Sequence, residues 1–333
     1  MKGVAPRSAA IGIALALLLA LPFWLGHHTY YINISSQILF WAIAALALNV
    51  LVGYAGLVSL GHAALLAMAG YTAALMLQAG YGHGVGSLAA VAVTLAASAA
   101  FAVLALRSTG IGFLMITLAL GQIVWGVAYR WASLTNGDNG VNLNGRPAPF
   151  GISLASPEAF YYTTLLCFLV ALVSMWVFVR SPFGVSLAGT RDQPRRMTAL
   201  GFNVWLIRFL AFVLSGFWSG IAGLLYVYYH QFIAPPVASL QASAEILLMV
   251  ISGGTATLLG PIAGAAIVVI MKNVVSAYVE RWNLVLGVIF ILIISFMPEG
   301  LVPGSVRLSR TGWNWLRARF GGGAVASPRE RTS

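Results

Sequence analysis

Apolar segments of membrane-spanning length recur along the whole chain and constrain its fold more than any other feature. A helix needs about 20 apolar residues to cross roughly 30 Å of hydrocarbon. Ten segments approach that length, at about 9–25, 35–52, 59–79, 87–106, 111–130, 160–179, 206–229, 240–252, 258–278 and 283–297. The eighth is short and ends at Gly253-Gly254, as a half-helix would. We therefore predict an all-α integral membrane protein, a polytopic bundle of eight to ten transmembrane helices.

The scarcity of charge supports this prediction. Only 8% of the 333 residues are charged and the mean hydropathy is +0.91, whereas soluble domains carry roughly 25% charged residues. Lipid must therefore be the solvent for most of the chain. The segment at 9–25 follows Lys2 and Arg7 and has two interpretations, a cleaved signal peptide or an uncleaved first helix. We favour the uncleaved helix, because no A-x-A-like site follows the segment.

The distribution of basic residues predicts the orientation. The net charge is +11, which in a membrane protein indicates the positive-inside bias rather than nucleic-acid binding. An inside N-terminus leaves only Arg130, Arg146, Lys272 and Arg281 outside. The inside segments then hold Lys2, Arg7, Arg107, Arg180, Arg191, Arg195, Arg196, Arg208, Arg307, Arg310, Arg317, Arg319, Arg329 and Arg331. We expect both termini on the inner side.

Two long segments lie between predicted spans. The outer segment, 131–159, is rich in Gly, Asn and Pro, and it is either a surface that receives a partner or a solvated linker. In the inner segment, 180–208, Thr190 is a candidate N-cap and Gly201 a candidate C′ glycine of a short amphipathic helix, with Pro194 in its first turn. An arginine-bearing helix at the inner face suits docking, although a topology-setting charge cluster is the alternative.

Small residues predict close helix packing and breaks in helices. G-x-x-x-G patterns at 216–220 and 260–264 lie in apolar segments, where small residues let helix backbones approach closely. Other glycines interrupt predicted spans, at Gly53, Gly56, Gly61, Gly253 and Gly254. Unwound backbone survives at membrane depth only where protein buries it or water lines it, and transporter pathways use such breaks. Short turns at the inner face are the alternative.

Few polar side chains lie within the predicted spans. Those that we take as candidate pathway residues, with Gly253 and Gly254, are Asn49, Ser59, His62, Thr117 and Glu245. Glu245 is the one carboxylate within an apolar segment; such a group is costly and is usually functional or paired, although an interfacial, solvated role is the alternative. For His62, a hydrogen-bonded structural role is favoured over ligand binding.

Several catalytic signatures are missing from the sequence. No G-x-x-x-x-G-K-[ST] occurs, and the only lysines, Lys2 and Lys272, lie outside glycine loops, so the chain is no P-loop ATPase. No His or Cys pair has metal-site spacing, the single Cys167 excludes an internal disulfide, and Ser59 is not in a G-x-S-x-G elbow. We therefore expect no catalytic site, metal or cofactor in this chain, and an energy source outside it.

Four motifs resemble the branched-chain amino acid ABC permeases, with matching order and spacing over about 35–303. They are the run LNVLVGYAGLVSLGHAA at 48–64, RSPFG at 180–184 with the 190–203 loop, EILLMVISGG at 245–254 continuing to Gly260-Pro261, and PEGL at 298–301. The segments TLALG at 117–121 and LTNG at 134–137 before Asn139-Gly140 are similar to the LivM-type rather than the LivH-type subunit. Leu57 and Ala256 depart from the family pattern, which often has Gln and Gly there.

The resemblance implies a permease domain at 1–303 and a basic cytoplasmic tail at 304–333, in a bacterial inner membrane. It implies a heterodimer with a LivH-type permease, two cytoplasmic subunits that bind ATP, an external solute-binding protein, a lipid environment and no nucleic acid. The implied coupling element comprises Arg191, Asp192, Arg195, Arg196, Ala199, Leu200 and Gly201.

The implied function is import of branched-chain or related small amino acids, although relatives of this type also carry urea, short amides and aromatic acids. A stand-alone ion-coupled carrier or channel, or a membrane-embedded enzyme, are the alternatives of another class.

Overall fold

The computed structural model describes most of the predicted spans. The described residues are 18–22, 24, 29–143, 145–146, 154–276, 278, 282–297 and 300–304. The predicted first span at 9–25 therefore lies largely, and the predicted tail at 304–333 almost entirely, outside them. Pro298 and Glu299 of the fourth motif lie outside them as well.

The described part of the chain is mostly helical. Its longer helices are α2 (Thr29–Asn49), α3 (His62–Gln78), α4 (His83–Ala105), α5 (Ile111–Arg130), α7 (Pro157–Arg180), α10 (Val204–His230), α11 (Leu240–Gly253), α12 (Leu259–Val275) and α13 (Trp282–Phe296). Its short elements are the π-helix η1 (Val50–Ala55), α6 (Ala132–Thr135), η2 (Gly137–Asn139), β1 (Val141–Asn142), α8 (Pro182–Asp192), α9 (Pro194–Ala199), β2 (Phe232–Ile233) and η4 (Pro235–Ala238).

Five helices are long and apolar enough to cross a membrane by length and composition. They are Thr29–Ala55 (α2 with η1), α4, α5, α7 and α10. The predicted spans at 59–79, 240–252 and 258–278 correspond to the shorter apolar helices α3, α11 and α12. The 15-residue α13 corresponds to 283–297, so every predicted span after the first has a helix within the described residues.

Polar residues before the helices explain where they begin. The Ser156 hydroxyl accepts a hydrogen bond from the Ala159 N–H at the start of α7, and Ser239 caps α11 in the same way. The Asn203 carboxamide oxygen accepts from the Leu206 N–H at the start of α10. These side chains satisfy N–H groups that the first helical turn leaves without a helical partner.

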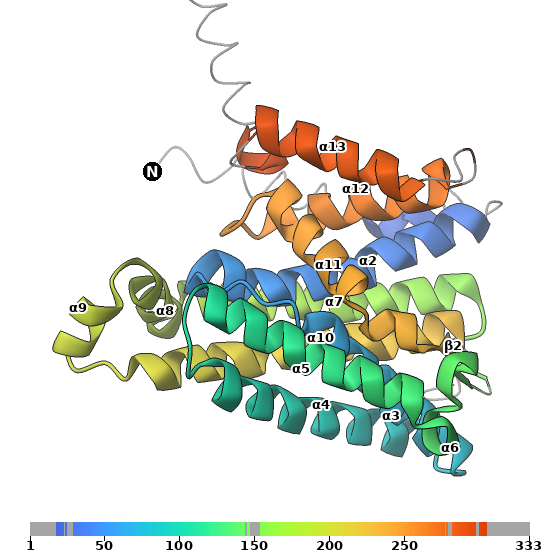
Figure 1. Ribbon diagram of the computed structural model, residues 1–333. Helices are drawn as coiled ribbons and strands as arrows, with labels where there is room; N and C mark the ends of the chain where they lie inside the picture. The colour runs from blue at the N-terminus through green and yellow to red at the C-terminus, as the bar shows by residue number, and fades with distance from the viewer. Residues whose placement is uncertain are drawn as a thin grey trace, which may run out of the picture.

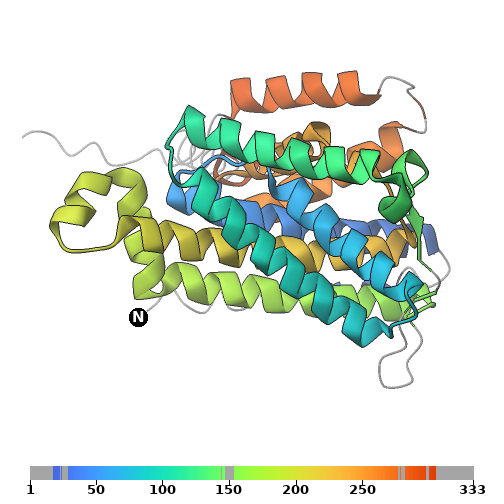
Figure 2. The same cartoon turned by 60° about the horizontal axis from the view of Figure 1, so that its bottom comes forward.

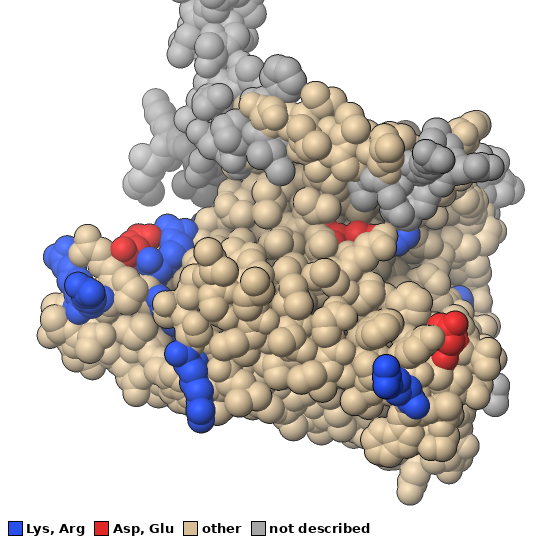
Figure 3. All heavy atoms as spheres, viewed as in Figure 1, with Lys and Arg blue, Asp and Glu red and all other residues tan. Residues whose placement is uncertain are grey.

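The long helices run between two different ends of the molecule (Figures 1 and 2). We call the end that carries α8 and α9 the arginine end, and the end that carries α6, β1 and β2 the loop end. In the space-filling view, charged side chains gather over α8 and α9, whereas the middle of the same face is almost uncharged apart from one adjacent acidic and basic group (Figure 3). The uncharged middle suits contact with lipid.

Burial separates central helices from peripheral ones. The apolar windows of α2 and α10 are 78% and 67% buried, whereas that of α5 is 22% buried. The core therefore forms around α2, α3 and α10, and the exposed apolar side chains of α4, α5 and α7 face outward. An apolar outer surface is expected where the solvent is lipid.

The 131–159 segment is partly ordered at the loop end. β1 pairs with β2 in antiparallel register, with Val141 opposite Ile233. The Arg146 guanidinium donates to the carbonyls of Tyr228 (3.1 Å) and Tyr229 (3.0 Å) at the end of α10, and burial lowers its pKa. A cation is favourable at a helix C-terminus because of the helix dipole. Residues 144 and 147–153 lie outside the described part, and neither interpretation of this segment is tested.

The predicted inner helix is divided into two. Thr190 is buried within α8, which begins after the Ser181 cap, so the prediction that Thr190 is an N-cap is wrong. The chain breaks at Gln193 because Pro194 has no N–H to continue a helix, and Pro194 becomes the first residue of α9. Gly201, with φ of +87°, follows the last turn as predicted for a C′ glycine.

The G-x-x-x-G patterns lie at tight helix contacts. A Cβ atom on Gly264 of α12 would collide with the Met249 carbonyl of α11. One turn beyond the 216–220 pattern, a Cβ atom on Gly223 of α10 would collide with the Leu66 carbonyl of α3. A backbone oxygen cannot rotate away as a side chain can. The absence of a side chain at these glycines therefore sets how closely the helices approach.

We predict that Gly264→Ala lowers stability by about 1–3 kcal/mol, because the added methyl forces α11 and α12 apart. Gly126→Ala in α5 is the matched control, since a Cβ there meets nothing within 4 Å. The control should be neutral or more stable, because alanine favours a helix more than glycine does. Thermal unfolding of both purified variants measures the difference, and equal stability would contradict the packing role.

Candidate functional site

The end of the first long helix is broken and packs against a second break. η1 ends at Ala55 and is followed by Gly56, whose φ is +68°, and the chain then runs without helix to Gly61. Asn49 donates from Nδ2 to the Thr257 carbonyl (2.8 Å) and accepts at Oδ1 from the Ala256 N–H (3.1 Å). One buried side chain thus bonds to a carbonyl and an N–H of the loop between α11 and α12.

The two breaks approach each other at backbone distance. A Cβ atom on Gly53 would collide with the Ala256 backbone, and a Cβ atom on Gly253 would collide with the Gly260 carbonyl. Gly254 has a φ of +118°, which favours glycine. Because Gly253 and Gly254 pack against backbone here, both are contact positions in this conformation, and their pathway role stays a prediction.

Arg191 connects α8 to the first break. Its Nη1 donates to the Gly53 carbonyl (2.6 Å), and its Nε pairs with Asp192 Oδ1 (2.9 Å). The aliphatic part of Arg191 lies against Gly56, where a Cβ atom would leave 2.5 Å to Arg191 Cγ. The arginine therefore joins the short helices at the arginine end to the π-helical end of the span Thr29–Ala55.

The rest of the predicted coupling element is exposed. Asp192, Arg195, Arg196, Ala199, Leu200 and Gly201 are all accessible. A cavity of about 570 Å³ lies between α8–α9 and the turns at 55–57 and 109–110, with Arg191, Arg195, Arg196 and Arg208 among its lining residues. Basic side chains around a hollow form a surface that suits an acidic protein partner.

Ser59, His62 and Thr117 are all buried and hydrogen-bonded within the protein. Ser215 donates to the Ala47 carbonyl, so its oxygen accepts from His62 Nε2–H, at 2.7 Å. His62 Nδ1 then accepts from Ser59 at 3.0 Å. The Thr117 hydroxyl accepts from the Leu60 N–H at 3.2 Å. This geometry agrees with a structural His62 within the described residues, and the pathway role of all three stays a prediction.

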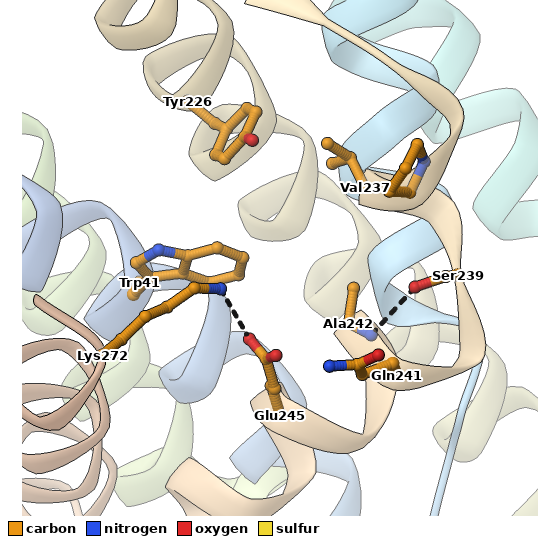
Figure 4. A pocket seen from close by; sticks show the side chains of 9 residues that line it. Trp41, Tyr226, Val237, Ser239, Gln241, Ala242, Glu245 and Lys272 are labelled. Atoms are coloured by element: carbon orange, nitrogen blue, oxygen red, sulfur yellow. Dashed lines mark hydrogen bonds and ion pairs between the residues drawn. The ribbon is translucent and has the colours of Figure 1, made fainter. Parts of the chain in front are cut away.

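Glu245 differs from these candidates because it lines a cavity. The cavity measures about 230 Å³ and lies between α2, α10, η4, α11 and α12. Lys272 of α12 pairs with Glu245 of α11, with 3.2 Å between Nζ and Oε2. Figure 4 shows Lys272 passing the Trp41 ring to reach Glu245. Tyr226 lies on the side of the cavity opposite Glu245.

Lys272 is the residue that sequence reasoning missed. The distribution of basic residues places it on the outer side and predicts no partner for it. The structure brings it to Glu245 because α11 and α12 form a tight antiparallel hairpin. The signal available in the sequence was a single acid and a single lysine in consecutive apolar segments, since unpaired charges there are costly.

Comparison with known proteins identifies the family. The model of the "branched-chain amino acid transport system / permease component" family matches residues 30–294. The chain belongs to this permease family. LivM of Escherichia coli K12, a high-affinity branched-chain amino acid transport permease, is 27% identical over 87% of this chain and 73% of its own. A probable LivM of Methanocaldococcus jannaschii is 25% identical over 82% of this chain and 94% of its own.

Family membership confirms the predicted all-α, multi-pass membrane fold of an ABC permease and the recognition of the LivM type. The permease is a transport component and not an enzyme. A more distant relative, the guanosine permease NupQ of Bacillus subtilis, is 29% identical over 20% of this chain and 21% of its own. Membership of the family therefore leaves the substrate of this permease to be inferred from its own residues.

The structure explains one departure of this permease from the family pattern. Ala256 has a φ of +59°, in the left-handed region that glycine tolerates and that other residues adopt at a cost of about 1–3 kcal/mol. The glycine that the sequence resemblance leads us to expect here is thus the residue that this backbone favours, and Ala256 holds a strained conformation beside Asn49.

We predict that Ala256→Gly raises the melting temperature of the permease, because relief of the left-handed strain exceeds the added flexibility of the unfolded chain. Ala263→Gly, at a regular helical position in α12, is the control and should be destabilised by about 0.5–1 kcal/mol. Thermal unfolding in the same detergent compares the two. A lower melting temperature for Ala256→Gly would contradict the strain.

Proposed function

We propose that this permease forms half of the pore of an ATP-driven importer of branched-chain or related small amino acids. A related LivH-type permease forms the other half, two ATP-binding subunits dock at the arginine end, and a solute-binding protein delivers substrate at the loop end. The arginine end faces the cytoplasm of the bacterial inner membrane, because basic residues are retained on that side.

The contact between Arg191 and Gly53 is the observation that carries this proposal. α8 and α9 extend past the ends of the long helices in both views, which leaves them accessible to a partner (Figures 1 and 2). A partner that moves α8 also moves the Gly53 backbone through Arg191. Gly53 packs on Ala256, and Asn49 bonds to the same loop.

This arrangement favours an ATPase-coupled permease over a stand-alone carrier or channel. A carrier that works alone has no need of an exposed basic element tied to a helix break, whereas a subunit driven by partner ATPases needs such an element to receive their movement. The substrate is a separate question, since the names of the relatives include branched-chain amino acids and guanosine. Urea, short amides and aromatic acids are the alternative substrates.

We predict that replacing Arg195 and Arg196 together with Glu abolishes ATP-driven uptake, because the reversed charges repel an acidic docking surface. Uptake is measured in proteoliposomes that contain the whole transporter, and affinity for the solute-binding protein should be unchanged. Arg107→Glu, an exposed change at the same end, is the matched control and should leave uptake largely intact.

Wild-type uptake by the double variant would refute docking at α8–α9. Concentrative uptake by this chain without ATPase subunits would refute the wider proposal and would support the stand-alone carrier.

A further inference from the structure

The ion pair between Glu245 and Lys272 lies in an unusual place for two charges. Both residues belong to apolar helices, and aromatic and aliphatic side chains line the same cavity. Removing two charges from water costs several kcal/mol per ion, and the attraction between them repays this only with good geometry. A pair of apolar residues would fill the space at lower cost, so the charges call for an explanation beyond packing.

The two partners differ in freedom. The Glu245 side chain is 10% exposed and sits on α11, whereas the Lys272 side chain is 45% exposed. A lysine ammonium on its flexible stem moves easily, while a buried carboxylate stays where its helix holds it. Lys272 can therefore swing away from Glu245 and remain within reach of the cavity.

Glu245 and Lys272 carry opposite charges, and this restricts what can enter between the partners. A ligand with one ammonium and one carboxylate replaces one ion pair by two. A ligand without an ammonium that displaces Lys272 leaves the buried Glu245 carboxylate without a cation, which costs several kcal/mol. A ligand without a carboxylate gains no ion pair with Lys272. An uncharged ligand such as urea cannot replace Lys272 as the cation on Glu245, so it gains no ion pair from either residue.

The remaining lining of the cavity fits a small, partly apolar solute. Trp41 and Tyr226 form an edge-to-face pair with ring centroids 6.0 Å apart, and Val237 lies beside them. The volume of about 230 Å³ is below the roughly 300–1,000 Å³ of pockets for drug-sized ligands. In Figure 4 the aromatic rings lie on one side of the cavity and Glu245 on the other.

We propose that Glu245, Lys272, Trp41 and Tyr226 form a binding site for free amino acids, in which the ligand ammonium takes the place of Lys272 on Glu245 and the ligand carboxylate pairs with Lys272. The side chain of the ligand packs on Trp41 and Tyr226. The assignment rests on the proposed function in that the solute passes through this subunit. It selects amino acids over urea, amides and carboxylic acids that lack an ammonium group.

The test is equilibrium binding of labelled leucine and alanine to the transporter in lipid nanodiscs, without the solute-binding protein and without ATP. Leucinamide lacks the carboxylate and 4-methylpentanoate lacks the ammonium. Each should compete with leucine at least 10-fold more weakly than unlabelled leucine does, which corresponds to about 1.4 kcal/mol. Equal competition by the three compounds, or no saturable binding of either amino acid, would overturn the proposal.

Two variants separate recognition from folding, because each should change a ratio of affinities that partial unfolding does not alter. Glu245→Gln should bring the affinity for 4-methylpentanoate close to that for leucine. Lys272→Met should bring the affinity for leucinamide close to that for leucine. Gln241→Ala, which lines the same cavity without a charge, is the matched control and should keep the wild-type ratios. Unchanged ratios in both charge variants would assign the pair to structure alone.

The outcomes also distinguish a failure of this proposed site from a failure of the proposed function. If binding shows no charge selectivity but ATP-driven uptake persists, the site is wrong and the importer stands. If uptake proceeds without ATPase subunits while the selectivity ratios behave as expected, the site stands and the coupling is wrong.

Discussion

Unwound backbone within a membrane bundle must find its hydrogen-bond partners inside the protein, and this requirement organises the arginine end. η1 replaces α-helical by π-helical hydrogen bonding, and the 56–61 segment and the loop between α11 and α12 are not helical. Asn49, in the helix that precedes the first break, makes two hydrogen bonds to the second. Since each break lies on the other without room for a Cβ atom at Gly53, neither can be rebuilt alone. The close contact between the two breaks therefore requires glycine in both of them.

The same requirement explains why Arg191 has a structural partner deep in the fold. A terminal turn of a helix leaves carbonyls without helical donors, and the Gly53 carbonyl receives the Arg191 guanidinium. A charged donor makes a stronger hydrogen bond than a neutral one. α8 is thus attached to the π-helical end of the first long helix. α9 contributes no buried residue and remains available at the surface.

Local signals in the sequence predicted the elements well and the tertiary pairs poorly. Ser156, Asn203 and Ser239 precede apolar runs, so the starts of α7, α10 and α11 lie within a few residues of the predicted ones. Thr190 also looked like a cap, but Ser181 with Pro182 begins a helix earlier and buries it. The partnership of Asn49 with residues 256–257, and of Glu245 with Lys272, depends on how helices pack, which no local pattern records. The rule that a carboxylate in a span has a partner or a function agrees with the ion pair between Glu245 and Lys272, whereas a pathway role of Glu245 stays a prediction.

α11 connects the cavity at Glu245 to the break at Gly253 and Gly254. Glu245 lies in the first half of this 14-residue helix, and Gly253 and Gly254 lie at the end that contacts the first break. A helix of about 21 Å transmits movement from one end to the other, because its backbone hydrogen bonds make it rigid. Movement of α11 against α12 separates Glu245 from Lys272, which is costly in an apolar cavity when nothing lies between the charges. A ligand that pairs with both charges lowers that cost, so occupancy of the cavity and movement of the helix favour each other by linkage.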